Sequence, residues 1–499
     1  MKRYIATLLF VMAAVGQASA QGERQMTLKE AVKLAVEKNL DVQAELYNPA
    51  SAEADINRFK GIYNPLLNLL ANYQYTNIET VNKFLTGGQP INREEAVNYN
   101  AGVTQLLPSG GTVGAQFNNL WNSNNSGIGI TNDYFQSNLA LTFSQPLLQG
   151  FGRDVTEINI SVARLNKEGS LDQFKTKLMN IISQVRTQYS LLYSARENLT
   201  VKKTSLELAE TILTNTRAQV KAGVLPAMEI LNAEFGVATQ QKNLIDAERA
   251  LKDQTDALRV LLQIHELTDI IPTDTPYKDE LQIDENGALQ RALDERPDLR
   301  QQRVTVRTNE LQERVARTQT LPNLAFTAGA AFYGLDRRYH RDIEGVGSGQ
   351  FPVYNVGLQF TYPIGNDAAE NAYIKSKLLV EQSKTQVKSL EESITKDVRT
   401  ALRAVNSNYK QLEVTSRGRA YAEEVVQAYI KKQKVGLATT KDVLDVLNNQ
   451  VTAEGNQIQA VADYNNAITT LWATTGELLE KEGIRVTAED ADQLYRKNR

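Results

Sequence analysis

The stretch between Asp154 and Ala222 constrains the fold more than any other part of this sequence, because it contains no proline and keeps one helical rhythm. Its apolar residues recur at alternating spacings of three and four, which is the heptad pattern of helices that pack against other helices. The seam begins with Leu171, Phe174, Leu178, Ile181, Val185 and Leu192. A continuous helix of this length would be ~100 Å long. The sequence therefore predicts a long helix over 154–222 that requires helical neighbours.

The same rhythm returns in the second half of the chain and predicts a helix over 368–434. Its seam consists of Val387, Leu390, Ile394, Val398, Ala401, Val405, Tyr409 and Leu412. Each long helix is expected to end at a glycine, Gly223 or Gly436, because glycine reaches left-handed backbone easily. Shorter helices are expected over 28–62, 226–263, 287–320 and 440–480, and the first and third of these can stack end to end on the returning helices.

Four other segments alternate apolar and polar residues with period two, which predicts β-strands. They are 66–78, 133–145, 323–334 and 352–362. In the last segment Tyr354, Val356 and Leu358 share one face, and small polar residues occupy the other. This pattern suits transmembrane β-strands around a wet lumen, and it also suits a soluble sandwich. The scarcity of charge within the segments favours the membrane.

The first twenty residues, MKRYIATLLFVMAAVGQASA, combine two positive charges, an apolar run and a small-x-small cleavage site. This predicts a signal peptide over 1–20 and a mature chain outside the cytoplasm. The chain has no cysteine, so it can form neither disulfides nor thiolate metal sites. Beyond the signal no apolar run reaches the length of a membrane-spanning helix.

The two halves repeat one plan. The sequence AVKLAVEKNLDV at 31–42 resembles ALQRALDERPDL at 288–299, and KAGVLPAMEIL at 221–231 resembles KVGLATTKDVL at 434–444. Such self-similarity indicates a tandem duplication. We expect a first repeat over 21–263, an irregular connector over 264–286 that can form a belt, a second repeat over 287–480, and a polar, loosely held tail over 481–499.

Prolines and glycines mark each change from strand to helix. A proline withdraws a backbone donor from the sheet, and a glycine permits the bend. We therefore interpret these positions as swivels between strand and helix directions. The predicted swivel residues are Pro65, Pro146, Gly150, Gly152, Pro322 and Pro363.

The chain resembles the TolC-like outer membrane efflux protein family from about Leu28 to Glu480. The resemblance is carried by ERPDL at 295–299, SQPLLQGFGR at 144–153 and VGLATTKDVLDV at 435–446, within the duplicated layout. It implies a mixed α/β membrane protein, in which a homotrimer shares one transmembrane β-barrel, with four strands from each chain, and one α-helical coiled-coil tunnel in the periplasm.

The resemblance also implies a function and partners. The family forms the passive exit duct of tripartite efflux pumps or type I secretion systems in the Gram-negative outer membrane. It exports small molecules or proteins, without a cofactor, and docks to a periplasmic adaptor and an inner-membrane transporter. The alternative is a secreted structural coiled-coil protein with a soluble β head and no transport role.

Three acidic residues near the glycine turns are candidates for a gate. Asp442 and Asp445 match the family's ring-forming acidic positions, and Glu229 is the first-repeat counterpart of Asp442. Three copies would gather these carboxylates into a ring that favours cations. The alternative is that the acids only complement a helix dipole. Where the family often has a basic residue after the second glycine turn, this chain has Ala438, so a gate-closing link must differ here.

Apolar residues flank both glycine turns and are candidates for docking an adaptor, because exposed apolar tips otherwise have no evident purpose. A local hydrophobic staple between neighbouring helices is the alternative. The predicted docking residues are Gly223, Val224, Leu225, Val435, Gly436 and Leu437.

The region 80–131 contains a further hairpin candidate, 98–121, which exceeds the family's usual four strands. It can extend the barrel strands into an external hairpin or widen the barrel, and we expect the external hairpin. Catalysis is not expected, because His265 and His340 have no partners at ligand or triad spacing. The formal net charge of −3 shows no basic excess for nucleic acid.

Overall fold

The computed structural model describes residues 23–79, 81, 83, 86, 88, 90–125, 133–266 and 268–498. The expected signal peptide over 1–20 lies outside the described residues. The chain divides into two compact units, each assembled from separate stretches. Unit 1 comprises Met1–Glu45, Phe174–Pro297 and Glu392–Val486, and unit 2 comprises Leu46–Gln173, Asp298–Glu391 and Thr487–Arg499.

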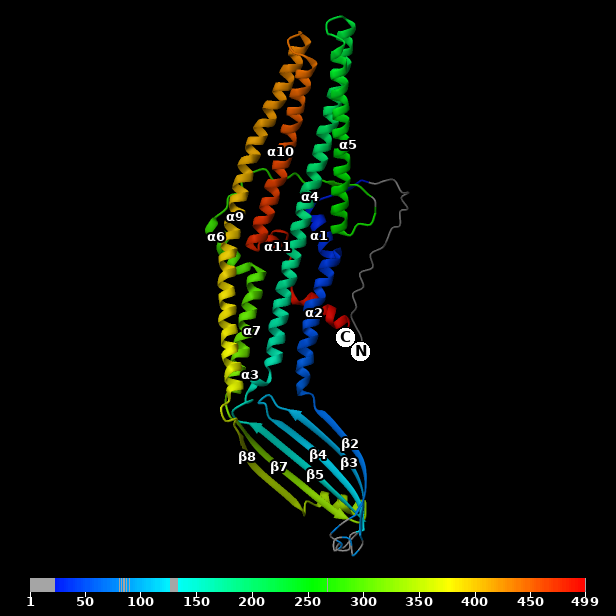
Figure 1. The fold of residues 1–499 in the computed structure, drawn as a ribbon, viewed down its shortest axis with the longest axis vertical. Helices are drawn as coiled ribbons and strands as arrows, with labels where there is room; N and C mark the ends of the chain where they lie inside the picture. The colour runs from blue at the N-terminus through cyan, green and yellow to red at the C-terminus, as the bar shows by residue number, and fades with distance from the viewer. Residues whose placement is uncertain are drawn as a thin grey trace, which may run out of the picture. The chain divides into compact units, whose positions relative to one another are not determined.

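The two heptad seams form the long helices α4 (Ile158–Lys221) and α9 (Asp367–Lys434), each of which contributes residues to both units. Within unit 1, α5 (Met228–Leu262) returns along α4, and α10 (Thr440–Thr475) returns along α9, so that two helical hairpins are formed (Figure 1). In the parts of the chain that the structure describes, no helix is long and apolar enough to cross a membrane.

The predicted helices over 28–62 and 287–320 are each divided in two. In the first, α1 (Leu28–Lys38) is followed by α2 (Leu40–Lys60) and the short 3₁₀ helix η1 (Gly61–Tyr63). The Asn39 side chain separates α1 from α2, because its Oδ1 accepts hydrogen bonds from the first backbone N–H groups of α2. In the second, α6 (Glu285–Glu295) precedes α7 (Pro297–Gln319), which starts on a proline at its first position.

The connector and the tail are more ordered than their polar composition indicates. Within the connector, β6 (Ile270–Pro272) pairs in parallel with β1 (Arg24–Met26). The short helix α11 (Leu478–Lys481) ends at the first residue of the tail, and the tail itself contains α12 (Ala488–Lys497). In unit 2, Ala491 of α12 is buried and Asp492 pairs with Lys167. The expectation of a loosely held tail is therefore wrong, because α12 has one face that packs.

Unit 2 contains a six-stranded antiparallel sheet with the order β2-β3-β4-β5-β7-β8 (Figure 1). Its strands are β2 (Leu66–Glu79), β3 (Ile91–Leu106), β4 (Thr112–Asn124), β5 (Asp133–Pro146), β7 (Asn323–Asp336) and β8 (Pro352–Thr361). The registers place Leu69 beside Ala101, Phe117 beside Leu139, and Leu139 beside Phe332. The sheet therefore has one predominantly apolar face and one polar face.

The additional hairpin does not extend outside the sheet. β2 pairs with β3 along the whole length of β2, β4 pairs with β5, and β3 and β4 are about as long as their neighbours. The prediction of an external hairpin over 98–121 is therefore wrong, and the hairpin widens the sheet instead. Alternation in β3 and β4 matches that of the other strands, so both continue the same two faces.

Candidate functional site: the tips of the helical hairpins

Both hairpin tips use the same backbone turn. Gly223 has φ 76° and Gly436 has φ 76°, the left-handed conformation that ends a helix. Val224 N–H donates to Gln219 O at 2.9 Å, and Leu437 N–H donates to Lys432 O at 2.9 Å. These bonds satisfy carbonyl groups at the ends of α4 and α9. Both turns therefore end a long helix in the same way.

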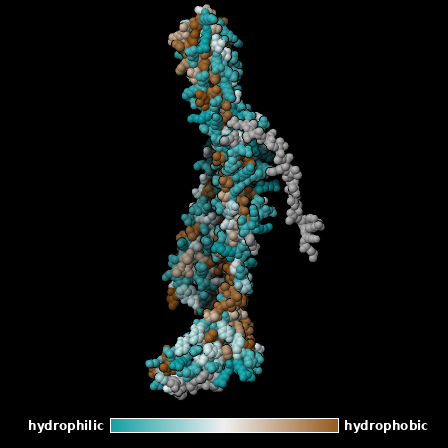
Figure 2. Space-filling model, turned by 90° about the vertical axis from the view of Figure 1, so that its right-hand side faces the viewer, coloured by the Kyte–Doolittle hydropathy of each residue, from teal (hydrophilic) through white to brown (hydrophobic). Residues whose placement is uncertain are grey.

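The predicted docking residues expose apolar side chains at these turns. Val224, Val435 and Leu437 are largely exposed, and Leu437 retains 77% of its accessible surface. Leu225 is half-buried. Figure 2 shows hydrophobic surface at the end of unit 1 where the helical hairpins turn. In the single chain the three exposed residues do not form a buried staple.

Thr440, the first residue of α10, connects the two hairpins. Its side chain and backbone are fully buried, and its N–H donates to Oε2 of Glu229 on α5 at 3.1 Å. Its hydroxyl lies 3.3 Å from the Thr216 hydroxyl on α4 and accepts from Nε2 of Gln433 on α9 at 3.3 Å. Residues from all four helices thus meet at one threonine.

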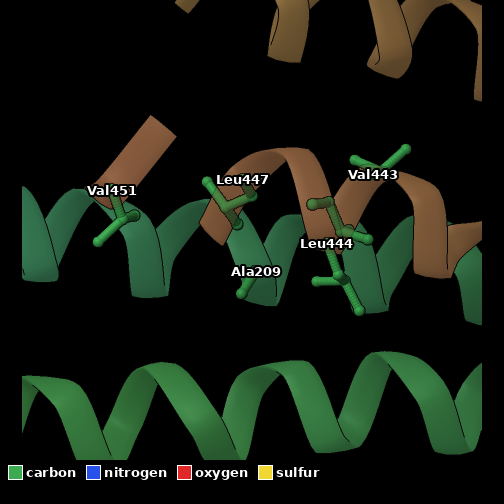
Figure 3. Packing of buried hydrophobic residues seen from close by; sticks show 6 residues of the cluster. Ala209, Val443, Leu444, Leu447 and Val451 are labelled. Carbon is green, nitrogen blue, oxygen red and sulfur yellow. The ribbon is translucent and has the colours of Figure 1, made fainter. Parts of the chain in front are cut away.

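A hydrophobic cluster lies beside this threonine and holds α4 against α10. Its buried members are Ala209, Ile212, Val443, Leu444, Leu447 and Val451, and Figure 3 shows five of them by name. α5 approaches the cluster closely, because a Cβ on Gly236 would lie 2.7 Å from a methyl carbon of Leu444. Beyond it, Nε2 of Gln240 donates to Oδ1 of Asn448 at 2.8 Å.

The three candidate gate acids surround the first turns of α10 but have different roles. Asp442 forms a capping box with Thr439: the Asp442 N–H donates to the Thr439 hydroxyl, and the Thr439 N–H donates to Asp442 Oδ2 at 2.9 Å. The Thr439 backbone N–H, followed by its hydroxyl, lowers the pKa of the Asp442 carboxyl. Asp445 is exposed one turn further along. Glu229 accepts the Thr440 N–H.

The threonine network was missed at the sequence level, although one signal was present. The spacing Thr439-x-x-Asp442 is a capping-box pattern that marks the start of a helix. The contacts of Thr440 with Thr216 and Glu229 connect residues more than two hundred positions apart. No local pattern specifies such a contact.

The predicted swivel residues lie where the strands of unit 2 end. Gly150 and Gly152 have φ 80° and φ 100°, and Pro146 ends β5. Pro65 and Pro322 immediately precede β2 and β7, and Pro363 follows β8. A contact not predicted from the sequence holds the Gly150 turn in place: a Cβ on Gly110 would lie 2.4 Å from the Gly150 carbonyl oxygen, so the β3–β4 turn packs directly on it.

The groups at the tips are suited to non-covalent contacts between helices and with other molecules. Among the described residues, no group of three or more histidine, cysteine, aspartate or glutamate side chains is placed to hold a metal ion. The tip offers carboxylates, hydroxyls and exposed apolar side chains. These groups can bind cations, hold helices together and dock proteins.

Comparison with known proteins identifies relatives of this arrangement. The sequence model of a family described as outer membrane efflux protein matches residues 31–262 and 288–477. The outer membrane efflux protein BepC of Brucella suis biovar 1 (strain 1330) is 21% identical over 360 residues, which cover 72% of this chain and 76% of BepC.

Solved outer membrane channels have the same fold. The CmeC channel of Campylobacter jejuni superposes with a TM-score of 0.65 at 16% identity, covering 94% of this chain and 89% of CmeC. The MtrE channel of Neisseria gonorrhoeae, in its open state, gives a TM-score of 0.62 at 17% identity and covers 90% of this chain and 89% of MtrE. These similarities establish a helical region combined with a β domain of this type.

Proposed function

Because this chain belongs to the outer membrane efflux protein family, it is an outer membrane export channel and not an enzyme, and we propose that three copies share one transmembrane β-barrel and one periplasmic helical tunnel. Passive export of small molecules or proteins through this duct is the proposed activity. The family does not favour the alternative of a secreted structural coiled-coil protein.

The sheet supports a shared barrel. Its apolar face includes strongly exposed side chains, among them Leu69, Tyr73, Val356 and Leu358, as lipid-facing positions require. β2 and β8 are edge strands in the single chain. Open edges do not occur in the hydrocarbon region of a membrane, so each edge needs a partner strand. Pairing β8 of one copy with β2 of the next would close the barrel, with six strands from each chain.

The helices support the same assembly. On α5, Met228, Leu231, Phe235 and Ile245 follow a spacing compatible with one heptad face, and all four are exposed. On α9, Val414, Tyr421 and Val425 are likewise exposed. Apolar seams of this kind are covered by other helices. We assign them to contacts between neighbouring copies, which would complete the tunnel wall.

At the tips, three copies would bring Asp442, Asp445 and Glu229 around one axis and form a cation-favouring constriction. The Glu229–Thr440 hydrogen bond provides a link between the two hairpins in place of a basic residue at Ala438. We propose that this link favours the closed gate. The exposed Val224, Val435 and Leu437 would dock the hairpin of a periplasmic adaptor, which connects the channel to an inner-membrane transporter.

One observation carries the proposed gate. Asp442, which forms the capping box of α10 with Thr439, and the exposed Asp445 lie on the first turns of α10, beside the Glu229–Thr440 hydrogen bond that links the two hairpins. We expect the double variant Asp442→Asn/Asp445→Asn to show larger single-channel openings and weaker block by divalent cations in planar bilayers. Asparagine retains an oxygen that can cap α10, so the variant removes charge and preserves the helix start.

The double variant needs an oligomer measurement and a matched control. Cross-linking of the detergent-purified protein should give trimers for both parent and variant. The control variant Asp246→Asn removes an exposed acid on α5 that pairs with Lys242 at 2.7 Å and should leave conductance unchanged. If divalent cations block the double variant as strongly as the parent, the assignment of these acids to a gate is wrong. If the purified protein is a monomer that is soluble without detergent, the channel proposal is wrong.

A further inference from the structure

Two polar side chains interrupt the apolar face of the sheet in unit 2. Asn119 on β4 and Ser137 on β5 are register partners, and they lie on the same face as Phe117, Phe135 and Leu139. Both are buried, although this face is otherwise exposed along several strands. Polar groups directed toward lipid without partners are costly. A covering element is therefore required here.

The covering element is α8 (Tyr339–Ser348), which follows β7. The fully buried Asp342 accepts a hydrogen bond from Ser137 N–H at 3.0 Å and a second from the Ser137 hydroxyl. The Tyr339 hydroxyl donates to Asn119 Oδ1 at 3.3 Å, and its ring centroid lies 5.5 Å from that of Phe135. A helix is thus attached to the apolar face by buried polar contacts.

Close backbone packing holds α8 in this position. A Cβ on Gly334 of β7 would lie 1.9 Å from the Asp342 carbonyl oxygen, and one on Gly345 would lie 3.1 Å from the Gly334 Cα. Only glycine permits this approach at Gly334. The segment that leads into the helix is therefore fixed relative to the sheet.

This fixed segment presents three arginines beside an aromatic side chain. Arg337, Arg338 and Arg341 are exposed, and within the described residues none of their guanidinium groups forms an ion pair. Besides the buried Asp342, two acids lie near these arginines. The Asp336 Oδ1 accepts a hydrogen bond from the backbone N–H of Arg338 at 2.8 Å, and Glu344 is exposed. Tyr339, at the start of α8, is the exposed aromatic side chain beside the arginines, whereas Leu335 pairs with Gln136 and therefore lies on the polar face of the sheet.

We propose that α8 and its flanking residues form a binding surface for a phosphorylated glycolipid of the outer leaflet, a proposal that rests on the proposed membrane function. β7 begins after α7 and ends before α8, so α8 lies at the end of β7 that is farther from α7, and we assign this end to the outer surface of the membrane. Guanidinium groups bind phosphate in a bidentate manner. The Tyr339 ring and the apolar face of the sheet beside α8, which includes the exposed Tyr354, would contact acyl chains, as apolar and aromatic residues do at membrane interfaces. This combination favours a lipid over free phosphate.

The test measures binding of bisphosphorylated lipid A to the detergent-purified full-length protein by native mass spectrometry. The triple variant Arg337→Gln/Arg338→Gln/Arg341→Gln should bind at least ~10-fold more weakly, since each cation near an anionic lipid surface contributes substantially to binding. The control Lys203→Gln/Arg249→Gln/Lys252→Gln removes three exposed cations from α4 and α5. It should bind as the parent does.

Two further arms identify the source of the phosphate and separate this inference from the channel proposal. Dephosphorylated lipid A should bind weakly, and inorganic phosphate should not compete with lipid A. Equal binding of lipid A by parent and triple variant, or full competition by inorganic phosphate, would overturn the lipid surface. Conductance in neutral phosphatidylcholine bilayers tests the channel by itself and should be the same for parent and triple variant.

Discussion

The hydrogen bond between Glu229 and Thr440 makes the most direct prediction about gating. The substitution Glu229→Ala removes the acceptor of the Thr440 N–H, which belongs to a fully buried residue at the first position of α10. The first N–H groups of a helix have no partner inside the helix. A buried donor left without an acceptor costs about 1–3 kcal/mol. The link between the hairpins should weaken by that amount.

A change of this size is large for a two-state gate. If the link is present only in the closed state, a loss of about 1–3 kcal/mol raises the ratio of open to closed channels roughly 5- to 150-fold. The assay is the open probability of single channels in planar bilayers, compared between parent and variant at equal voltage and salt. We expect longer and more frequent openings in Glu229→Ala.

Two controls separate the link from a general loss of charge. Glu229→Gln keeps an oxygen acceptor at the same position and should have a smaller effect. Glu234→Ala removes an acid of the same helix that pairs with Arg217 at 2.7 Å in an exposed ion pair, and such pairs contribute about 0–1 kcal/mol. Equal open probabilities for Glu229→Ala, Glu234→Ala and the parent would refute the reasoning.

Two more predictions concern the stability of the tip. Leu447 retains 2% of its surface, so Leu447→Ala should destabilise the helical hairpins by about 2–5 kcal/mol, measured by denaturant unfolding followed by circular dichroism; the exposed Leu437→Ala should be near neutral. Because the pKa of Asp442 is lowered in the folded state, its cap stabilises α10 above about pH 4 and is lost as the pH falls through the folded pKa. Amide exchange in the first turn of α10 should therefore accelerate at acidic pH, and Thr439→Ala should abolish that dependence; a profile unchanged by the substitution would contradict it.

The periodicities in the sequence located most of the secondary structure because they reflect burial directly. The heptad seams correspond to α4 and α9, and the four alternating segments correspond to β2, β5, β7 and β8. Gly223 and Gly436 marked the helix ends, since a left-handed residue is needed there. The breaks at Asn39 and Arg296 were not predicted, because a helix can continue its apolar face across a single interrupting residue.

Long-range pairing could not be read from the same patterns. β3 and β4 alternate like any other strand, and nothing local states whether such a hairpin joins the sheet or projects from it. The position of α8 depends on Asp342 meeting Ser137, two residues that are 205 positions apart. In both cases the deciding contact lies between segments whose own sequences are compatible with several arrangements.

Asp442 can take part in capping α10 and in a cation-binding ring at the same time. The sequence allows Asp442 to belong either to a cation-binding ring or to a helix terminus, and in the structure the Thr439 N–H and hydroxyl both donate to its Oδ2. The hydrogen bonds from Thr439 favour the ionised carboxylate, and a ring of carboxylates requires the same charge. The two roles therefore reinforce each other, because the cap keeps Asp442 ionised at the point where three copies would bring like charges together.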